Sequence, residues 1–309
     1  MSLRASLRTV LSQEDVNFLL TNRIPRAALT RFMGWFSKVE LAPVRAASIA
    51  AWKLFCDVDL ADAAPRHYRS LHEAFIRELR PGARAIDPRP EIIASPCDAI
   101  IGAHGPIAQG MALQVKGFAY PVADLLGSTA EAETFREGWF VTLRLTAGMY
   151  HRFHAPHDVA VEQVRYISGD TWNVNPIALK RIERLFCKNE RAPLLVRLEH
   201  GGARIALVPV AAVLVASIRL PWLDPVMDVR GRFARAGGEQ VVQPGPSARF
   251  AKGEEMGWFE HGSTIVVLAP PTHRLVASLR EGQPIRMGEP LMHIDERSFQ
   301  PLSIEGRHG

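Results

Sequence analysis

The stretch ARIALVPVAAVLVASI, residues 203–218, carries the strongest indication of the fold. Its uncharged part, Ile205 to Ile218, is 14 residues long, contains Pro209 and is rich in valine. A membrane-spanning helix needs about 20 apolar residues, and β-branched side chains favour strands. We therefore expect β-structure here and no membrane span.

Similar short runs recur on both sides of this stretch, separated by Gly, Pro and Asp turn signals. They cover residues 91–94, 100–102, 139–145, 159–167, 194–198, 263–268 and 275–279. One segment between them, residues 176–186, has the character of a helix. The pattern predicts a mainly β body.

The first 80 residues have a different character, since they read as helical with breaks at Pro25, Pro43 and Pro65. We therefore expect an α+β fold, in which a helical N-terminal region precedes a mainly antiparallel β body. The expected division is residues 1–80 and residues 81–309.

Charge is distributed unevenly along the chain. The 309 residues include 37 basic and 32 acidic side chains, a formal net charge of +5. Residues 1–56 alone carry eight Arg or Lys and three acids, so the remainder is neutral in sum. Any electrostatic attraction to a partner is therefore expected at the N-terminal region.

An amphipathic stripe lies in this basic region. Leu29, Phe32, Met33 and Phe36 follow the helical spacing i, i+3, i+4, i+7, and Trp35 lies among them. A basic amphipathic helix with an aromatic residue suits an anionic membrane surface. The alternative is that the stripe packs against the rest of the protein.

Several common functional motifs are absent from the sequence. It contains no GxGxxG after a strand, no GxxxxGK[ST], no HExxH and no GxSxG. The three cysteines, Cys56, Cys97 and Cys187, form no CxxC pair and are expected to be reduced thiols in a cytosolic protein. Charges within the first 25 residues argue against a secretory signal.

Three short segments carry residues suited to catalysis. They are Ser95-Pro96-Cys97-Asp98, Tyr150-His151-Arg152-Phe153-His154 and Glu260-His261-Gly262-Ser263-Thr264. Each has a plain structural alternative: a turn, a pair of structural histidines and a tight turn. Together they supply an Asp, a His and a Ser, the set that activates a hydroxyl nucleophile. The two histidines lack a third ligand at metal-site spacing, so no metal site is expected.

These segments and their order resemble the phosphatidylserine decarboxylases, a family of pyruvoyl-dependent enzymes made as self-cleaving proenzymes. The resemblance runs from about Phe75 to Leu268 and is expected to continue to the C-terminus. Its further blocks are residues 75–84, Val174-Asn175-Pro176, Asn189-Glu190-Arg191 and residues 252–257. The first 70 residues carry only general similarity.

The resemblance implies roles for particular residues. His154, oriented by Asp98, would deprotonate Ser263, whose hydroxyl would attack the carbonyl of Gly262. Cleavage would give chains 1–262 and 263–309 and leave Ser263 as a covalent pyruvoyl group, which serves as the electron sink of the decarboxylation. His151 or His154 would handle the proton of the decarboxylation.

The resemblance also implies the substrate and the partners: phosphatidylserine in a membrane, converted to phosphatidylethanolamine by a peripheral enzyme on the cytoplasmic face. The N-terminal helices would contact the anionic membrane surface or form a homodimer, and no nucleic acid is expected. Alternatives are a pyruvoyl decarboxylase of another amino acid or serine-headed lipid, and a non-enzymatic lipid-binding module. Ala99, Ala211 and Ala216 stand where the family has glycine, so they bear on substrate choice.

Overall fold

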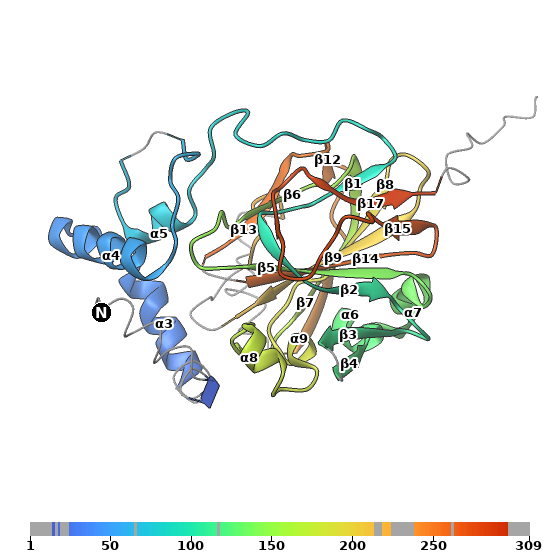
Figure 1. The fold of residues 1–309 in the computed structure, drawn as a ribbon, viewed down its shortest axis with the longest axis horizontal. Coiled ribbons are helices and arrows are strands. Elements are labelled where there is room, and N and C mark those ends of the chain that lie inside the picture. The colour runs from blue at the N-terminus through green and yellow to red at the C-terminus, as the bar shows by residue number, and fades with distance from the viewer. Residues whose placement is uncertain are drawn as a thin grey trace, which may run out of the picture.

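The computed structural model describes residues 14, 15, 18, 25–64, 67–115, 118–212, 218–223, 238–260 and 263–295. Helices α3, α4 and α5 stand at one end, and the strands, together with a few short helices, form the rest of the molecule (Figure 1). Pairings between named strands in this part of the chain are antiparallel. The α+β prediction, helices first and then a mainly antiparallel body, is confirmed.

A nine-stranded sheet forms the centre of the body, in the order β11-β7-β8-β9-β14-β5-β2-β16, with β12 also paired to β7. Its middle strands, β9 (Arg204–Ala211) and β14 (Ser263–Ala269), are covered on both faces. A strand buried on both faces reads as a continuous apolar run, which is why these two were visible in the sequence. The other strands are β2 (Ala99–Pro106), β5 (Trp139–Leu145), β7 (Val159–Ile167), β8 (Leu194–Leu198), β11 (Glu239–Val242), β12 (Arg249–Phe250) and β16 (Pro284–Ile285).

Alternate residues of β14 divide the core into two clusters. Ile265 and Val267 pack on one side of the sheet, and Val266 and Leu268 pack on the other. Small sheets cover the first side: β1 (Ile92–Ala94), β17 (Pro290–Ile294) and β15 (His273–Leu275), then β10 (Ile218–Arg219), β13 (Glu255–Phe259) and β6 (Arg152–His154). The second side carries β3 (Met111–Val115), β4 (Phe118–Pro121), α6 (Val122–Leu126), α7 (Thr129–Ala132), η1 (Glu133–Phe135), α8 (Pro176–Leu179) and α9 (Leu185–Lys188). In Figure 1, β3, β4, α8 and α9 are seen below the sheet.

The N-terminal helices are α3 (Arg26–Phe36), α4 (Ala42–Phe55) and α5 (Leu71–Phe75). Trp52 and Phe75 belong to their own apolar cluster. The Trp52 indole N–H donates to the carbonyl of Ala147 at 3.0 Å, and Arg77 donates to that of Gly148 at 3.1 Å. These bonds join the helical region to the loop that follows β5. None of the described helices is long and apolar enough to span a bilayer.

Some sequence expectations for the elements are wrong. The expected break at Pro43 is present, since α3 ends at Phe36 and Pro43 lies in the first turn of α4, where its missing N–H needs no partner; the errors lie further along the chain. Residues 176–186 hold a short helix, α8, and only the start of α9, because Arg184 adopts a left-handed conformation with φ of 52°. The strand expected at 275–279 ends at Leu275. The run 203–218 ends as a strand at Ala211, and residues 213–217 lie outside the described residues.

Candidate active site

Asp98 is held by an ion pair at the start of β2. Arg84 donates to both carboxylate oxygens, from Nε to Oδ1 at 3.0 Å and from Nη2 to Oδ2 at 2.6 Å. The backbone N–H of Met287 donates to Oδ1 at 2.9 Å. Both charged side chains are largely buried, so the pair fixes the carboxylate in one orientation.

His154 lies on β6 and has its two ring nitrogens in defined roles. Nδ1 lies 2.9 Å from the carbonyl of Gly253, which can only accept, so Nδ1 carries the proton. Nε2 is then the basic nitrogen, and it accepts from the hydroxyl of Tyr150 at 2.9 Å. Burial lowers the pKa of His154 and raises the pKa of Tyr150, so both groups stay neutral at neutral pH.

A cavity of about 410 Å³ lies beside these residues, and we call it the polar cavity. Arg84, Tyr150 and His154 line it, together with Met287 and Gly253. The described contacts of the Asp98 carboxylate are to Arg84 and Met287 rather than to His154. A backbone bond from His154 N–H to the Pro96 carbonyl at 2.8 Å keeps the two segments adjacent. His154 thus lines the cavity itself, whereas Asp98 lies behind the lining residues Arg84 and Met287, and no described hydrogen bond joins Asp98 to His154.

His151 lies apart from that cavity, under helix α5. Its Nδ1 donates to the carbonyl of Met149 at 2.8 Å, which leaves Nε2 as the basic nitrogen of the neutral ring. The imidazole is fully buried, and its centroid lies 4.0 Å from that of Phe75. The helical region therefore covers His151.

Ser263 is the first residue of β14. It pairs with Leu145 of β5 and with Ala211 of β9. Its hydroxyl is fully buried and has no hydrogen-bond partner among the described residues. No hydrogen bond in this part of the chain joins it to Asp98 or His154. Gly262 and His261 lie outside the described residues, as does Ala216.

A second cavity of about 390 Å³, which we call the apolar cavity, lies between the helices and the end of β5. Met33, Trp52 and Phe75 contribute from the helical side, and Leu145 contributes from β5. Arg144 is the only charged side chain among the described residues that line it. Burial lowers the pKa of Arg144, and no carboxylate of the described residues compensates for it. A half-buried cation at an apolar wall is suited to an anionic ligand.

Residues of the remaining sequence blocks join neighbouring segments of the body through an ion pair and hydrogen bonds. Arg152 on β6 pairs with Glu255 on β13 at 2.7 Å. Asn189 donates to the carbonyls of Trp172 and Ala211, and Arg191 donates to those of Asp124, Leu125, Cys187 and Asn189. The sequence analysis assigned no role to Arg84 or Tyr150, although both lie in segments that it singled out.

Comparison with known proteins gives one consistent result. A family model described as phosphatidylserine decarboxylase matches residues 71–293. The phosphatidylserine decarboxylase proenzyme of Vibrio cholerae serotype O1 is 37% identical over 280 residues, covering 87% of this chain and 95% of the relative. The proenzymes of Aliivibrio salmonicida and Photobacterium profundum are 35% and 37% identical, covering 87% and 88% of this chain and 95% and 94% of their own lengths.

Proposed function

Because the chain belongs to the phosphatidylserine decarboxylase family and is therefore a decarboxylase, we propose that it matures by cutting itself between Gly262 and Ser263. The observation that carries this proposal is the Ser263 hydroxyl, which is fully buried and has no partner among the described residues. Leaving a buried hydroxyl unpaired costs about 1–3 kcal/mol. A group kept at such a cost needs an explanation, and a role in chemistry is one.

The residue fits the pyruvoyl group that this cleavage would leave at position 263. The hydroxyl is consumed in forming the group, so the structure after cleavage no longer contains an unpaired O–H there. A pyruvoyl ketone supplies an electron sink for the bond that breaks when a carboxylate leaves as carbon dioxide. The chain's own residues then have two tasks, to bind the substrate and to move protons.

His154 is our candidate for the base that takes the Ser263 proton. Its neutral imidazole has Nε2 as the basic atom, which accepts from the Tyr150 hydroxyl, and both residues line the polar cavity. Asp98, held by the cavity-lining Arg84, contributes a fixed negative charge behind the cavity wall, which favours the imidazolium formed on proton uptake. His151, whose basic nitrogen is Nε2, is the candidate for handling the proton of the decarboxylation step.

Cleavage at this junction leaves the body assembled. β14 lies between β5 and β9, and β17 pairs with β1, so the segment after Ser263 is integrated into two sheets. Its residue Met287 also donates to Asp98. The two chains would therefore remain a single folded unit, as the many buried contacts of β14 require.

The apolar cavity is our candidate for the site of phosphatidylserine. Arg144 would pair with the phosphate or carboxylate of the head group, and the apolar wall of Met33, Trp52 and Phe75 would contact acyl carbon atoms. Arg144 lies on β5 opposite Thr264, the residue after Ser263. Binding here would thus place the lipid near the cleavage junction.

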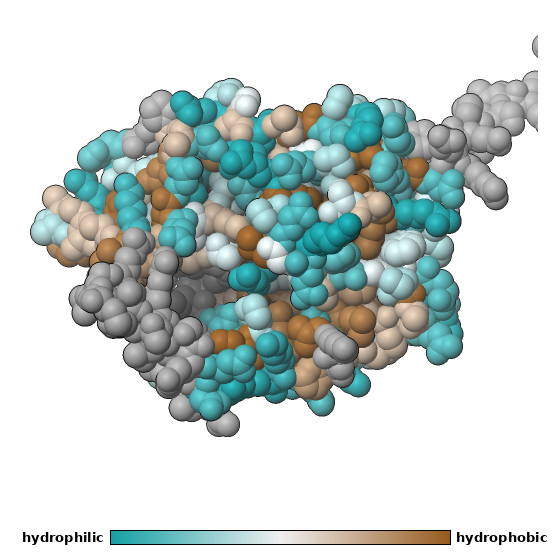
Figure 2. All heavy atoms as spheres, in the orientation of Figure 1, coloured by the Kyte–Doolittle hydropathy of each residue, from teal (hydrophilic) through white to brown (hydrophobic). Residues whose placement is uncertain are grey.

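The N-terminal helices are our candidate for peripheral attachment to the cytoplasmic face of the membrane. Large apolar side chains are exposed on them or beside them: Phe32, Trp35, Leu41, Leu54 and Phe55. Brown and tan surface marks this end of the molecule at the left of Figure 2. Exposed apolar groups next to basic residues suit an anionic lipid surface.

Intact mass and a substrate assay together test this function. The purified protein should show two chains, 1–262 and 263–309, in place of one of 34.2 kDa. It should release carbon dioxide from phosphatidylserine in mixed micelles, and much less from free serine or other amino acids. A single unprocessed chain would overturn the cleavage proposal, and preference for a free amino acid would favour the alternative substrate class.

A further inference from the structure

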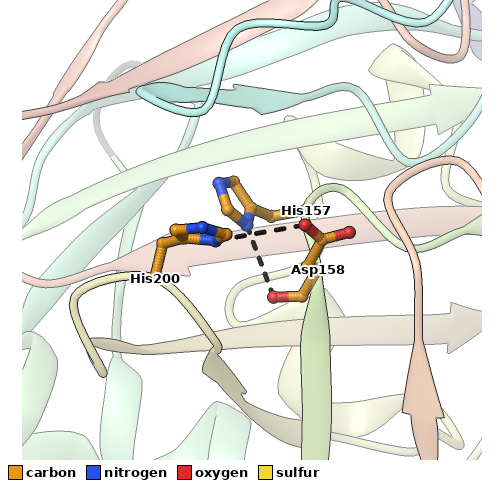
Figure 3. Close-up of side chains that lie close together, drawn as sticks. All are labelled: His157, Asp158 and His200. Carbon is orange, nitrogen blue, oxygen red and sulfur yellow. Dashed lines mark hydrogen bonds and ion pairs between the residues drawn. The ribbon is translucent and has the colours of Figure 1, made fainter.

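Three side chains of types that can ligate a metal meet outside both cavities: His157, Asp158 and His200 (Figure 3). One ligand atom from each lies within 4.8 Å of those of the other two. His157 and Asp158 precede β7, and His200 lies in the turn between β8 and β9. The pairing of Val159 with Leu198 brings these two places together. The sequence analysis did not consider this group, because its members come from separate segments.

The ring of His157 has one nitrogen held by a backbone carbonyl, as the ring of a metal-ligating histidine usually does. Its side chain is buried, and Nε2 lies 2.7 Å from the carbonyl of Pro90, to which it donates. The neutral ring then has its lone pair on Nδ1, but Nδ1 lies 3.3 Å from the carbonyl oxygen of Asp158. Two acceptors that face each other repel unless a proton or a cation lies near both. A backbone carbonyl that holds the other ring nitrogen is the usual support of a ligating histidine.

The Asp158 carboxylate is also oriented toward this group. Its Oδ1 accepts from the backbone N–H of Lys252 at 2.8 Å. Oδ2 lies 4.0 Å from Nδ1 of His200. The Lys252 ammonium donates to the Arg89 carbonyl at 2.8 Å. One carboxylate oxygen is thus anchored, and the other is directed at the second histidine.

We propose that His157, Asp158 and His200 bind one divalent transition-metal ion of the zinc class. Two neutral imidazoles and a carboxylate are ligands that Zn²⁺ prefers, whereas Ca²⁺ and Mg²⁺ prefer oxygen ligands alone. Zinc bonds of about 2.0–2.2 Å require the ligand atoms to be at most about 4.4 Å apart. His200, 54% exposed on its turn, can make the small rotation needed.

The bound ion would join the β8–β9 turn to the start of β7 and to the Lys252 segment. Lys252 precedes Gly253, whose carbonyl holds Nδ1 of His154. The expected effect is therefore stabilisation of the body on the side of the sheet that carries His154. The inference is independent of the proposed function, since it needs neither cleavage nor substrate.

Metal titration of the untagged full-length protein tests the proposal. Zn²⁺ is added in competition with a chelating dye to the native chain, to His200→Ala and to Asp158→Asn, which keeps an oxygen to accept from Lys252. We expect one tight site in the native chain and an affinity at least about tenfold lower in both variants. His293→Ala, an exposed histidine on β17, is the matched control and should bind as the native chain does. Equal affinity in all four proteins would overturn the proposal.

Thermal unfolding gives a second readout on the same proteins. Because an ion that binds only the folded state raises the melting temperature, Zn²⁺ should raise it in the native chain and in His293→Ala. It should not raise it in His200→Ala. Co²⁺ in place of Zn²⁺ should give visible ligand-field absorption that is lost in His200→Ala. A shift or a spectrum that survives in His200→Ala would overturn the assignment.

Discussion

The polar cavity and the apolar cavity differ in what holds their walls. Hydrogen bonds and an ion pair orient the polar cavity: Arg84 with Asp98, and Tyr150 with His154. Apolar packing forms the other, with Met33 and Trp52 contributed by the N-terminal helices. Charged groups are thus oriented by the β body, and lipid-compatible surface comes from the helices. Substitutions on the two sides should therefore fail in different ways, through processing on one side and through substrate or membrane affinity on the other.

The largest expected effect is that of Ser263→Ala. This variant removes the hydroxyl that would attack Gly262, so we expect a full-length chain on a denaturing gel and no decarboxylase activity. Thr264→Val is the matched control, because Thr264 is the next residue and its hydroxyl is also buried without a partner among the described residues. Cleavage of Ser263→Ala at the normal position would remove Ser263 from the mechanism.

Asp98→Asn should slow processing next most strongly. The substitution removes the charge that supports an imidazolium at His154, and a positioned acid–base system contributes about 10²- to 10⁴-fold in rate. We expect mostly uncleaved protein on the gel. Asp62→Asn is the control, since Asp62 is the more exposed second partner of Arg84. Normal cleavage in Asp98→Asn, or equal loss in both variants, would contradict a specific role for Asp98.

Arg144→Met tests the apolar side of the comparison. Processing should be normal, but KM for phosphatidylserine should rise about tenfold or more, because a charge-assisted hydrogen bond contributes about 1.5–3 kcal/mol. Arg144→Lys keeps the charge and should restore part of the affinity. Steady-state kinetics in mixed micelles separates KM from kcat. Unchanged KM in Arg144→Met would place the head group elsewhere.

Much of the body could be predicted from the sequence, for a physical reason. β5, β9 and β14 are buried enough on both faces to read as apolar runs. β6, with the sequence Arg-Phe-His, and the short β12 carry no such pattern, because tertiary contacts determine them. The helices α6 and α7 were missed because they are only five and four residues long.

The candidate site was predictable only as residue types. Asp98, His154 and Ser263 were named from their chemistry and from the order of the family's blocks. The contact of Arg84 with Asp98, and that of Tyr150 with His154, depend on how loops fold. His157 and His200 are likewise brought together by the pairing of β7 with β8. Distance between side chains is a property of the tertiary structure, and spacing along one sequence does not encode it.

The double variant Phe32→Ser with Phe36→Ser should weaken vesicle binding about tenfold. Phe32 is 51% exposed and stacks on Phe36 at 5.7 Å, and burying a large apolar side chain contributes about 1.5–3 kcal/mol. Co-sedimentation with phosphatidylserine-containing vesicles measures the effect. Val241→Ser on β11, which is 46% exposed, is the control and should bind normally. Unchanged binding with an altered oligomeric mass would indicate that these helices form a dimer contact instead.

The smallest expected effect concerns pH and His154. Burial is the main cause that lowers its pKa below the usual value of about 6.5, so the neutral, proton-accepting form persists to lower pH than in an exposed histidine. At pH 6.5, processing should thus keep more than half of its rate at pH 8. The unfolded state binds more protons than the folded state as pH falls below 6.5, so this group also costs stability there.

Cell-free synthesis at a series of pH values, followed by denaturing gels, measures the processing rate. The circular dichroism of unprocessed Ser263→Ala over the same range reports any acid unfolding, so that loss of the fold is distinguished from protonation of the base. A rate midpoint above pH 6.5 in a protein that stays folded would contradict the assignment of His154. A group with a higher pKa would then control the cleavage, and the polar cavity would lose its role in processing.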